Sequence, residues 1–408
     1  MYMRAHASYI MCFEMSSSQH SDRDATVSGF CHPLYENVRR TFRQNLVSGS
    51  ELGASVAVTV RGELVVDLWG GWADTAQAIP WTEQTITNVY STTKTMTALT
   101  ALVLVERGEL NLSDRVAKFW PEFANCGKSS VTVSQLISHS SGLPAWNQPI
   151  TIEDLYDWEK STDLLANQEP WWTPGSQSGY HMLSFGHLIG EVVRRITGVS
   201  FGRFFKTEIA IPLGSNFRIG LDPTDLPSVS PVVILQDAPE VVPPTEIASK
   251  TLVGPPLPRG GTVVNSDAWR SAQVPAANGH GNARSVAQIQ GLLTNRGEIS
   301  GRKILSDKVI SEAFKPIITS RDAVLGVPMT FASGFAVANL NHPTLGGRNA
   351  RFWGGFGGSR IVHELDHQMT FAYVMNKLNP SAFFGDLRGD DLLKSALQAT
   401  DSYHAENQ

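Results

Sequence analysis

A serine and a lysine three positions apart could act as a nucleophile and its base in the segment YSTTK at 90–94. The apolar run MTALTALVLV at 96–105 follows directly and predicts a buried helix. On a helix, this spacing puts the Ser91 hydroxyl and the Lys94 amine on one face, with the serine at the N-terminus, where backbone N–H groups favour developing negative charge. A lysine desolvated beside an apolar helix can lose its proton near neutral pH and serve as the base that a hydroxyl needs.

Two other serine motifs compete with this assignment. The Ser-x-x-Lys pattern arises by chance about once in a chain of this length, and it recurs at Ser300 and Lys303, in a polar stretch that predicts a surface loop. The sequence GVSFG at 198–202 matches the nucleophile elbow, which requires a strand before the serine and a helix after it. Because a helical pattern precedes the motif, we interpret Ser200 as a structural residue just beyond a helix end. Ser91 itself has an alternative as a helix N-cap without a catalytic role.

The apolar patterns that must position these residues give strands at both ends of the chain and helices in its middle. Alternating or β-branched runs predict strands at 55–60, 63–69, 329–338, 359–365 and 368–376. Apolar residues at three- and four-residue spacing predict helices at 34–47, 91–108, 152–165, 183–197, 284–295 and 389–400. The predicted fold class is α/β (α+β), with an antiparallel sheet built from both chain ends, flanking terminal helices and an inserted, mostly helical subdomain.

The same order predicts the domain organisation. We expect a flexible N-terminal tail at 1–26, an α/β subdomain made of 27–85 and 296–408, and a helical subdomain at 86–295. Residues 223–275 contain ten prolines, which disfavour both helix and central strand. They predict a long irregular excursion inside the helical subdomain.

Composition and charge exclude several classes of protein. The 408 residues are 42% hydrophobic and 17% charged, as in ordinary globular proteins. With a formal net charge of −5 and no cationic stripe, neither nucleic acid nor an anionic membrane is an expected partner. The three cysteines lack the paired spacing of a zinc or redox site, and no metal and no cofactor is expected. Free thiols and a poor secretory signal predict a reducing, cytoplasmic location.

Four motifs, in the right order, carry a resemblance to a known superfamily. They are NVYSTTKTMTAL around Ser91, SHSSGL at 138–143, Gly179-Tyr180-His181 after a Pro-Gly loop, and RFWGGFGGS at 351–359. The set resembles the serine β-lactamase and penicillin-binding-protein superfamily, and within it the class C-like family VIII carboxylesterases, from about residue 30 to 385. The resemblance implies a β-lactamase-like fold with Ser91 as nucleophile, Lys94 as its general-base partner and Tyr180 as a second proton-transfer group.

Departures from the family pattern bear on the substrate. Trp353 stands where the family's Lys-Thr-Gly element has its lysine, which removes a cation used near a substrate carboxylate. Met182 stands where an amide side chain would bind an acylamide, and it supplies apolar surface instead. Both departures favour neutral esters over β-lactams and peptides. The resemblance implies an oxyanion hole made by the N–H groups of Ser91 and Phe356, and a substrate-binding surface that comprises Ser91, Met182, Trp353, Gly354, Gly355 and Phe356.

The division of labour between Lys94 and Tyr180 stays open at this stage. A phenol with a pKa near 10 serves as a base only if a cation such as Lys94 lowers that pKa. Because the deacylation glutamate motif of class A enzymes is missing, the pair would also have to activate water. We interpret His139, in the tight turn HSSGL, as a residue that hydrogen-bonds the local backbone rather than a catalytic one.

The sequence therefore predicts a serine hydrolase of carboxylesterase type that cleaves small neutral esters through an acyl-enzyme on Ser91. An acyltransferase of small-molecule biosynthesis that uses the same acyl-enzyme is the alternative. A β-lactamase and a catalytically silent binding protein are weaker alternatives. The expected partner is a small-molecule ester or acyl donor; the physiological substrate and the oligomeric state stay open.

Overall fold

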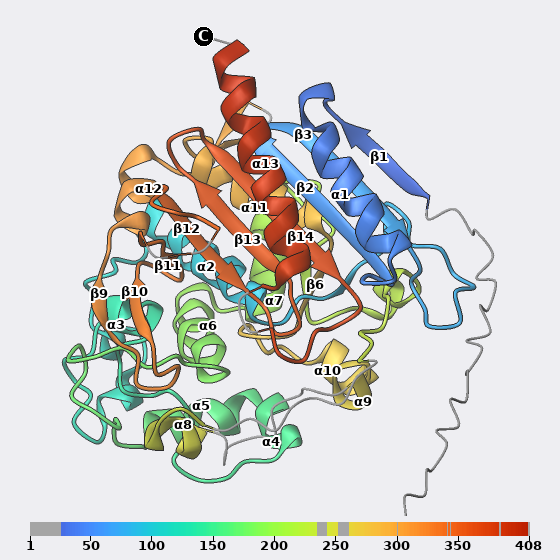
Figure 1. Cartoon of the computed structure of the whole chain (residues 1–408). Helices are drawn as coiled ribbons and strands as arrows, with labels where there is room; N and C mark the ends of the chain where they lie inside the picture. Colours follow the sequence, from blue (N-terminus) through green and yellow to red (C-terminus); the bar gives the residue numbers. More distant parts are fainter. Residues whose placement is uncertain are drawn as a thin grey trace, which may run out of the picture.

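The computed structural model describes residues 26–234, 243–251, 261–299, 301–340, 342, 344–382 and 385–406. Residues 1–25 of the predicted N-terminal tail, Cys12 among them, lie outside this part of the chain. Figure 1 shows a large sheet with helices on both of its faces. This mixed architecture confirms the predicted fold class. Among the described residues, no helix combines the length and the apolarity that a bilayer crossing requires.

Nine antiparallel strands form the central sheet, in the order β1-β3-β2-β14-β13-β12-β11-β10-β9. They are β1 (Val27–Cys31), β2 (Gly53–Val60), β3 (Glu63–Gly71), β9 (Ile318–Arg321), β10 (Pro328–Phe331), β11 (Ala336–Val337), β12 (Ala350–Gly354), β13 (Arg360–Glu364) and β14 (Met369–Met375). The N-terminal β2 pairs with the C-terminal β14, from Val60 opposite Met369 to Ala54 opposite Met375. The two ends of the chain thus build one sheet, as predicted.

Helices cover the two faces of the sheet. On one face, α1 (Glu36–Val47) and α13 (Leu387–Glu406) pack against each other, and α13 crosses β14 in the front of Figure 1. On the other face, α11 (Ala283–Thr294) lies against β2, β13 and β14, and α2 (Thr93–Glu106) contacts α11. The remaining helices are α3 (Val133–Ile137), α4 (Ile152–Tyr156), α5 (Trp158–Ala166), α6 (Ser184–Thr197), α7 (Phe201–Phe205), α8 (Glu246–Thr251), α9 (Gly261–Val264), α10 (Asp267–Ser271) and α12 (Asp307–Phe314).

The central helix α2 is buried on every side from Thr93 to Leu104, in keeping with a mostly apolar sequence that has no charged face. Its threonines keep the interior polar groups satisfied by bonding to nearby backbone carbonyls. Thr95 donates to the Thr92 carbonyl at 2.8 Å, and Thr100 donates to the Met96 carbonyl at 2.7 Å. The threonine hydroxyls are therefore satisfied although the helix is buried.

Short strands tie the start of α2 to distant segments. β4 (Thr87–Asn88), β6 (Gly279–Gly281) and β5 (Arg218–Ile219) form a three-stranded sheet in the order β4-β6-β5. β4 directly precedes the turn that carries Ser91. β7 (Glu298–Ile299) and β8 (Arg302–Lys303) form a separate two-stranded hairpin.

Two elements differ from the predicted ones because tertiary contacts decide them. The strand predicted at 329–338 is a hairpin, β10 and β11, whose tight turn places Gly334 at φ +80° against Ala98 of α2. A Cβ at this glycine would lie 2.3 Å from the Ala98 Cβ, so close packing requires the turn. The helix predicted at 152–165 breaks into α4 and α5 at Asp157, which is extended and accepts a 3.0 Å bond from the Lys160 N–H as a helix cap.

The proline-rich excursion at 223–275 also contains more regular structure than predicted. Helices α8, α9 and α10 lie within it, and a 3₁₀ turn spans Pro223–Ser228. Prolines at the first turn of a helix are tolerated because the lost N–H has no intrahelical partner. Residues 235–242 and 252–260 of the excursion lie outside the described residues.

Candidate active site

The structure brings together the three residues predicted to do chemistry. Ser91 lies in a 3₁₀ turn, Tyr90–Thr92, that leads into α2, and Lys94 follows one turn later on the same face. The Ser91 Oγ atom is 3.1 Å from Lys94 Nζ and 2.6 Å from the Tyr180 hydroxyl, which comes from the loop before α6. The nucleophile candidate therefore contacts both candidate proton-transfer groups directly.

Lys94 is buried beside Ser91, and its amine has three hydrogen-bond partners. Its side chain is fully buried, and burial lowers its pKa well below the ordinary value of 10.5. Besides Ser91 Oγ, its amine contacts the carbonyl oxygens of Met182 at 2.8 Å and Ala276 at 2.9 Å. A neutral amine has two N–H groups and one lone pair. With two N–H groups taken by these carbonyls, loss of the third proton would leave the lone pair facing Ser91 Oγ, 3.1 Å away, where it can accept the hydroxyl proton.

Tyr180 is held in the opposite state. Burial raises the pKa of its phenol, although hydrogen bonds with Ser91 and Trp353 act in the other direction. The lowered pKa that a tyrosine base would need does not occur, because burial outweighs the hydrogen bonds to the phenol. Tyr180 thus keeps its proton near neutral pH and donates it to Ser91 Oγ. The geometry fits Lys94 as the base and Tyr180 as a proton donor.

The backbone of Tyr180 is fixed by a carboxylate that the sequence did not single out. Asp322 is buried in the turn between β9 and β10, and its Oδ1 accepts the Tyr180 N–H at 3.0 Å. The same oxygen accepts the N–H groups of Val324 and Leu325 at 3.0 and 2.8 Å. Nothing in the local sequence indicated this role, because the two residues are 142 positions apart.

Aromatic side chains pack behind Tyr180. Trp353 of β12 is 1% exposed, with its ring centre 5.4 Å from that of Tyr180 and stacked on His139 at 5.8 Å. The sequence predicts Trp353 as part of the substrate-binding surface; in the structure its buried indole packs on the Tyr180 ring. His139 accepts the His181 N–H on Nδ1 at 3.2 Å, a backbone contact as expected, but from a distant segment. Burial lowers the pKa of His139 far below its usual value, so the ring is neutral.

The glycine-rich loop after β12 lies against the turn that carries Ser91. Ser359 Oγ donates to the Val89 carbonyl at 2.8 Å, and a Cβ on Gly355 would lie 2.2 Å from that carbonyl oxygen. The Phe356 ring packs on the Tyr90 ring with centres 5.4 Å apart. The loop thus places Phe356 beside the Ser91 turn, as the predicted oxyanion hole requires.

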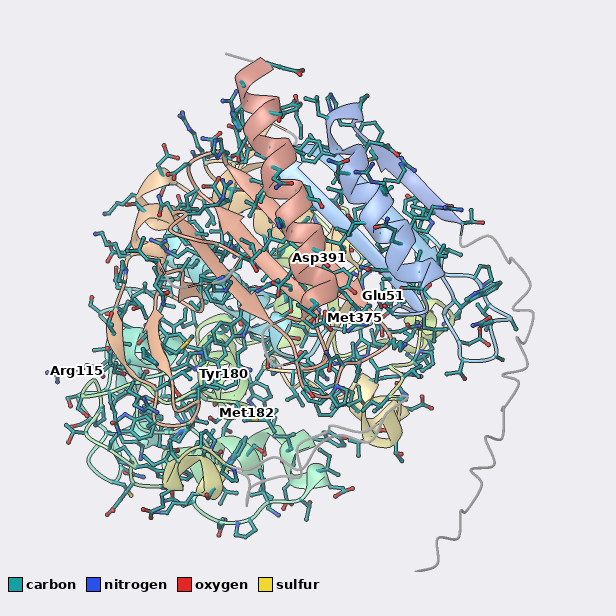
Figure 2. The ribbon with its side chains drawn as sticks, in the orientation of Figure 1. Glu51, Arg115, Tyr180, Met182, Met375 and Asp391 are labelled. Carbon is teal, nitrogen blue, oxygen red and sulfur yellow. The ribbon has the colours of Figure 1, made fainter. Side chains whose placement is uncertain are left out.

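Met182 contributes through its main chain. Its carbonyl oxygen is one of the two that hold the Lys94 amine, and its side chain is half-buried against the core. In Figure 2, Tyr180 and Met182 lie close together below the sheet. Lys94 contacts the Met182 carbonyl in this region. Sequence reasoning missed the other carbonyl, that of Ala276, because a backbone oxygen leaves no signal in residue type.

Of the two competing serine motifs, the structure describes the one at Ser200, and it does not form a nucleophile elbow. Ser200 is exposed and occupies the N-cap position of α7 without a side-chain capping bond. The segment before it is helix α6, which ends at Gly198 with φ +72°. Since no strand precedes it, the nucleophile elbow is not formed. Its hydroxyl accepts a 3.2 Å bond from Gln273. Ser300 lies outside the described residues; Lys303 is exposed and pairs with Asp307 at 2.9 Å.

Known proteins share this fold and this arrangement of segments. A family model described as Beta-lactamase matches residues 38–394. The chain belongs to the Beta-lactamase family. This confirms the superfamily that the motifs indicated. The family match covers both chain ends and the helical middle, so the sheet and the segments that carry Ser91 and Tyr180 lie within it.

Several members of the Beta-lactamase family are similar over most of their length. The chain is 30% identical over 385 residues to Esterase/beta-lactamase LipL of Mycobacterium tuberculosis, which covers 89% of this chain and 86% of LipL. The crystal structure of a family VIII carboxylesterase superposes with a TM-score of 0.85 at 38% identity, over 92% of this chain and 100% of the other. A penicillin-binding-protein homologue from Caulobacter crescentus gives 0.84 at 32% identity, with the same coverage of both chains.

Proposed function

We propose that the protein is a serine carboxylesterase that hydrolyses compact, neutral esters through an acyl-enzyme on Ser91. One observation carries the proposal: Ser91 Oγ lies within hydrogen-bond distance of a buried amine and of a protonated phenol. Esterase relatives and a family VIII carboxylesterase structure support ester hydrolysis as the reaction. The protein is therefore a hydrolase that relies on proton transfer by Lys94 and Tyr180.

Acylation begins with attack of Ser91 Oγ on the ester carbonyl carbon while its proton passes to the Lys94 lone pair. The carbonyl oxygen becomes an oxyanion and accepts hydrogen bonds from the N–H groups of Ser91 and Phe356. When the tetrahedral intermediate collapses, the bond to the alcohol oxygen breaks. Tyr180 gives its proton to that departing alkoxide, and the Lys94 ammonium returns a proton to the phenolate. The products of this step are the free alcohol and an acyl group on Ser91.

Deacylation uses the same groups in the opposite order. A water molecule attacks the acyl carbonyl and loses its proton to the Lys94 and Tyr180 pair, which is coupled and need not have separable roles at this step. Ser91 Oγ leaves the intermediate and regains a proton. The carboxylic acid is then released, and both proton-transfer groups have their starting states.

The preference for neutral esters rests on two side chains. Trp353 replaces the lysine that superfamily members with Lys-Thr-Gly present next to a substrate carboxylate, and its indole packs on Tyr180. Met182 offers an apolar side chain where an amide would bind an acylamide. A substrate that carries neither a carboxylate nor an acylamide loses nothing from these replacements.

Hydrolysis of p-nitrophenyl acetate and butyrate by the wild type and by Ser91→Ala tests the proposal. We expect turnover by the wild type and its loss in the variant, with circular dichroism showing that the variant is folded. Equal activity of the two proteins would contradict the assignment. Repeating the assay with an alcohol acceptor distinguishes hydrolysis from acyl transfer, since a transferase yields mainly the new ester. Turnover of a chromogenic cephalosporin would identify a β-lactamase.

A further inference from the structure

The loop that carries Phe356 is rich in glycine and has little conformational preference of its own. Four of the five residues in the run GGFGG at 354–358 are glycines, which have the largest backbone freedom of any residue. Gly357 and Gly358 adopt φ angles of +89° and +128°, a region that other residues disfavour. An oxyanion hole requires N–H donors that are already aimed at the position of the developing charge. One backbone bond lies inside the run, from the Gly358 N–H to the Gly355 carbonyl at 3.2 Å. Contacts from outside the run must therefore help to set the direction of the Phe356 N–H.

Contacts hold the loop from two sides. On the side of the nucleophile, Ser359 Oγ bonds to the Val89 carbonyl, and its backbone carbonyl accepts the Gly355 N–H at 2.9 Å. On the far side, three bonds meet at Gly357. Its N–H donates to the Ala382 carbonyl at 2.9 Å, and its carbonyl oxygen accepts the Asn379 N–H at 2.9 Å and Arg388 Nη2 at 3.0 Å. Arg388 supplies the one charged donor among these far-side contacts.

Arg388 is itself rigidly held at the start of α13. Asp386 accepts from its Nη2 at 2.6 Å and from its Nε at 2.9 Å through one oxygen. Glu51, whose side chain is fully buried, accepts from Nη1 at 3.0 Å, and the Lys377 carbonyl accepts from the same nitrogen at 2.8 Å. Figure 2 places Glu51 near Met375, at the end of β14. Each nitrogen of the guanidinium therefore donates at least one hydrogen bond, and these bonds fix the orientation of the planar group.

We propose that Arg388 is a positioning residue for the oxyanion hole, since it fixes the Gly357 carbonyl and thereby the direction of the Phe356 N–H two peptide planes away. Arg388 touches neither Ser91 nor the other proton-transfer groups in any contact described above. It acts through the loop. The inference rests on the proposed function, because it assigns the guanidinium to stabilisation of the tetrahedral intermediate in ester hydrolysis.

Arg388→Lys keeps the positive charge but loses the fork, so one ammonium cannot bond to the Gly357 carbonyl, Asp386 and Glu51 in the same geometry. We expect kcat per active site to fall about ten-fold, less than the loss of a whole oxyanion donor. KM should stay within about two-fold of the wild-type value, because substrate binding precedes charge development. A boronic acid that mimics the tetrahedral intermediate should bind more weakly by the same factor as kcat.

Active sites are counted by burst titration with a fluorophosphonate, so that a loss of folded protein does not lower the measured kcat. Arg348→Gln is the matched control. It removes a bidentate pair with Asp401 farther along α13, with bonds of 2.8 and 3.2 Å, and makes no contact with the loop in the bonds described. We expect its kcat per active site and its boronate affinity to match the wild type.

The proposal is overturned if Arg388→Lys has the wild-type kcat per active site, or if boronate affinity is unchanged while kcat falls. Should Arg388→Lys yield no folded protein, Asp386→Asn replaces it, because this variant leaves the guanidinium in place and removes the charge that orients it. A several-fold lower kcat per site then supports the proposal, and an unchanged value contradicts it. A wild type without esterase activity refutes the proposed function instead, which separates the two failures.

Discussion

Replacing Lys94 with methionine tests whether the lysine is a neutral base. Methionine has nearly the same length and removes the amine, so we expect kcat to fall by about 10²–10⁴, the usual contribution of a positioned general base. The substitution also leaves the carbonyls of Met182 and Ala276 without their donor, which costs about 1–3 kcal/mol each regardless of pH. Stability at a single pH therefore cannot report the charge of the lysine.

The pH dependence of stability reports the charge directly. Burial lowers the pKa of Lys94 in the folded state, while the unfolded chain retains the ordinary value of 10.5. Between these two pKa values the unfolded state binds one more proton than the folded state, so the free energy of unfolding rises with pH. The slope is about 1.4 kcal/mol per pH unit. The contribution of Lys94 to stability is largest above pH 10.5, its pKa in the unfolded chain. It decreases as the pH falls toward the lower pKa of the folded state.

The measurement compares urea unfolding of the wild type and Lys94→Met at several pH values from neutral to alkaline. The two proteins share every other titrating group, so the difference in their free energies of unfolding isolates Lys94. We expect the free energy of unfolding of the wild type, relative to that of the variant, to rise by about 1.4 kcal/mol for each pH unit. A difference that does not change with pH would show that Lys94 is charged in the folded protein. The assignment of Lys94 as the base would then be wrong.

Three further predictions concern the remaining site residues. Tyr180→Phe keeps the ring packing and removes the proton donor, so kcat for p-nitrophenyl butyrate should fall by about 10²–10⁴ with little change in melting temperature; full activity would exclude the proton-donor role. Asp322→Ala should lower kcat because the Tyr180 N–H loses its acceptor, whereas Asp322→Asn retains an acceptor oxygen and most of the activity; equal effects of the two substitutions would contradict this positioning. Ser200→Ala should keep most of the wild-type activity, and its loss in a folded variant would revive the nucleophile elbow.

The sequence predicted the parts of the site that depend on local spacing. Ser91 and Lys94 meet because a spacing of three positions puts both side chains on one face of a helical turn. This much follows from helix geometry. Tyr180 was identified through a resemblance to a superfamily, since nothing local links it to a serine 89 positions away. The strands at both chain ends were predicted from their alternation, and their pairing into one sheet is confirmed.

The parts that could not be predicted depend on contacts between distant segments. Backbone carbonyls such as that of Ala276 hold the Lys94 amine in place, and their position is decided by packing. Trp353 was assigned to a family motif through the resemblance, but its burial against His139 depends on three separate segments. The sequence at 329–338 predicts one strand, whereas the structure has a hairpin. The contact that favours a turn at Gly334 comes from helix α2, more than 200 residues earlier.

Labelling with a fluorophosphonate, followed by mass mapping of the adduct, tests the central claim most directly. The reagent reacts with a serine that is activated by a base and leaves unactivated hydroxyls intact. The account predicts one adduct per chain, on the peptide that contains Ser91, and no adduct in Ser91→Ala. An unlabelled wild type, or an adduct on another serine such as Ser200, would contradict the claim that Ser91 is the nucleophile.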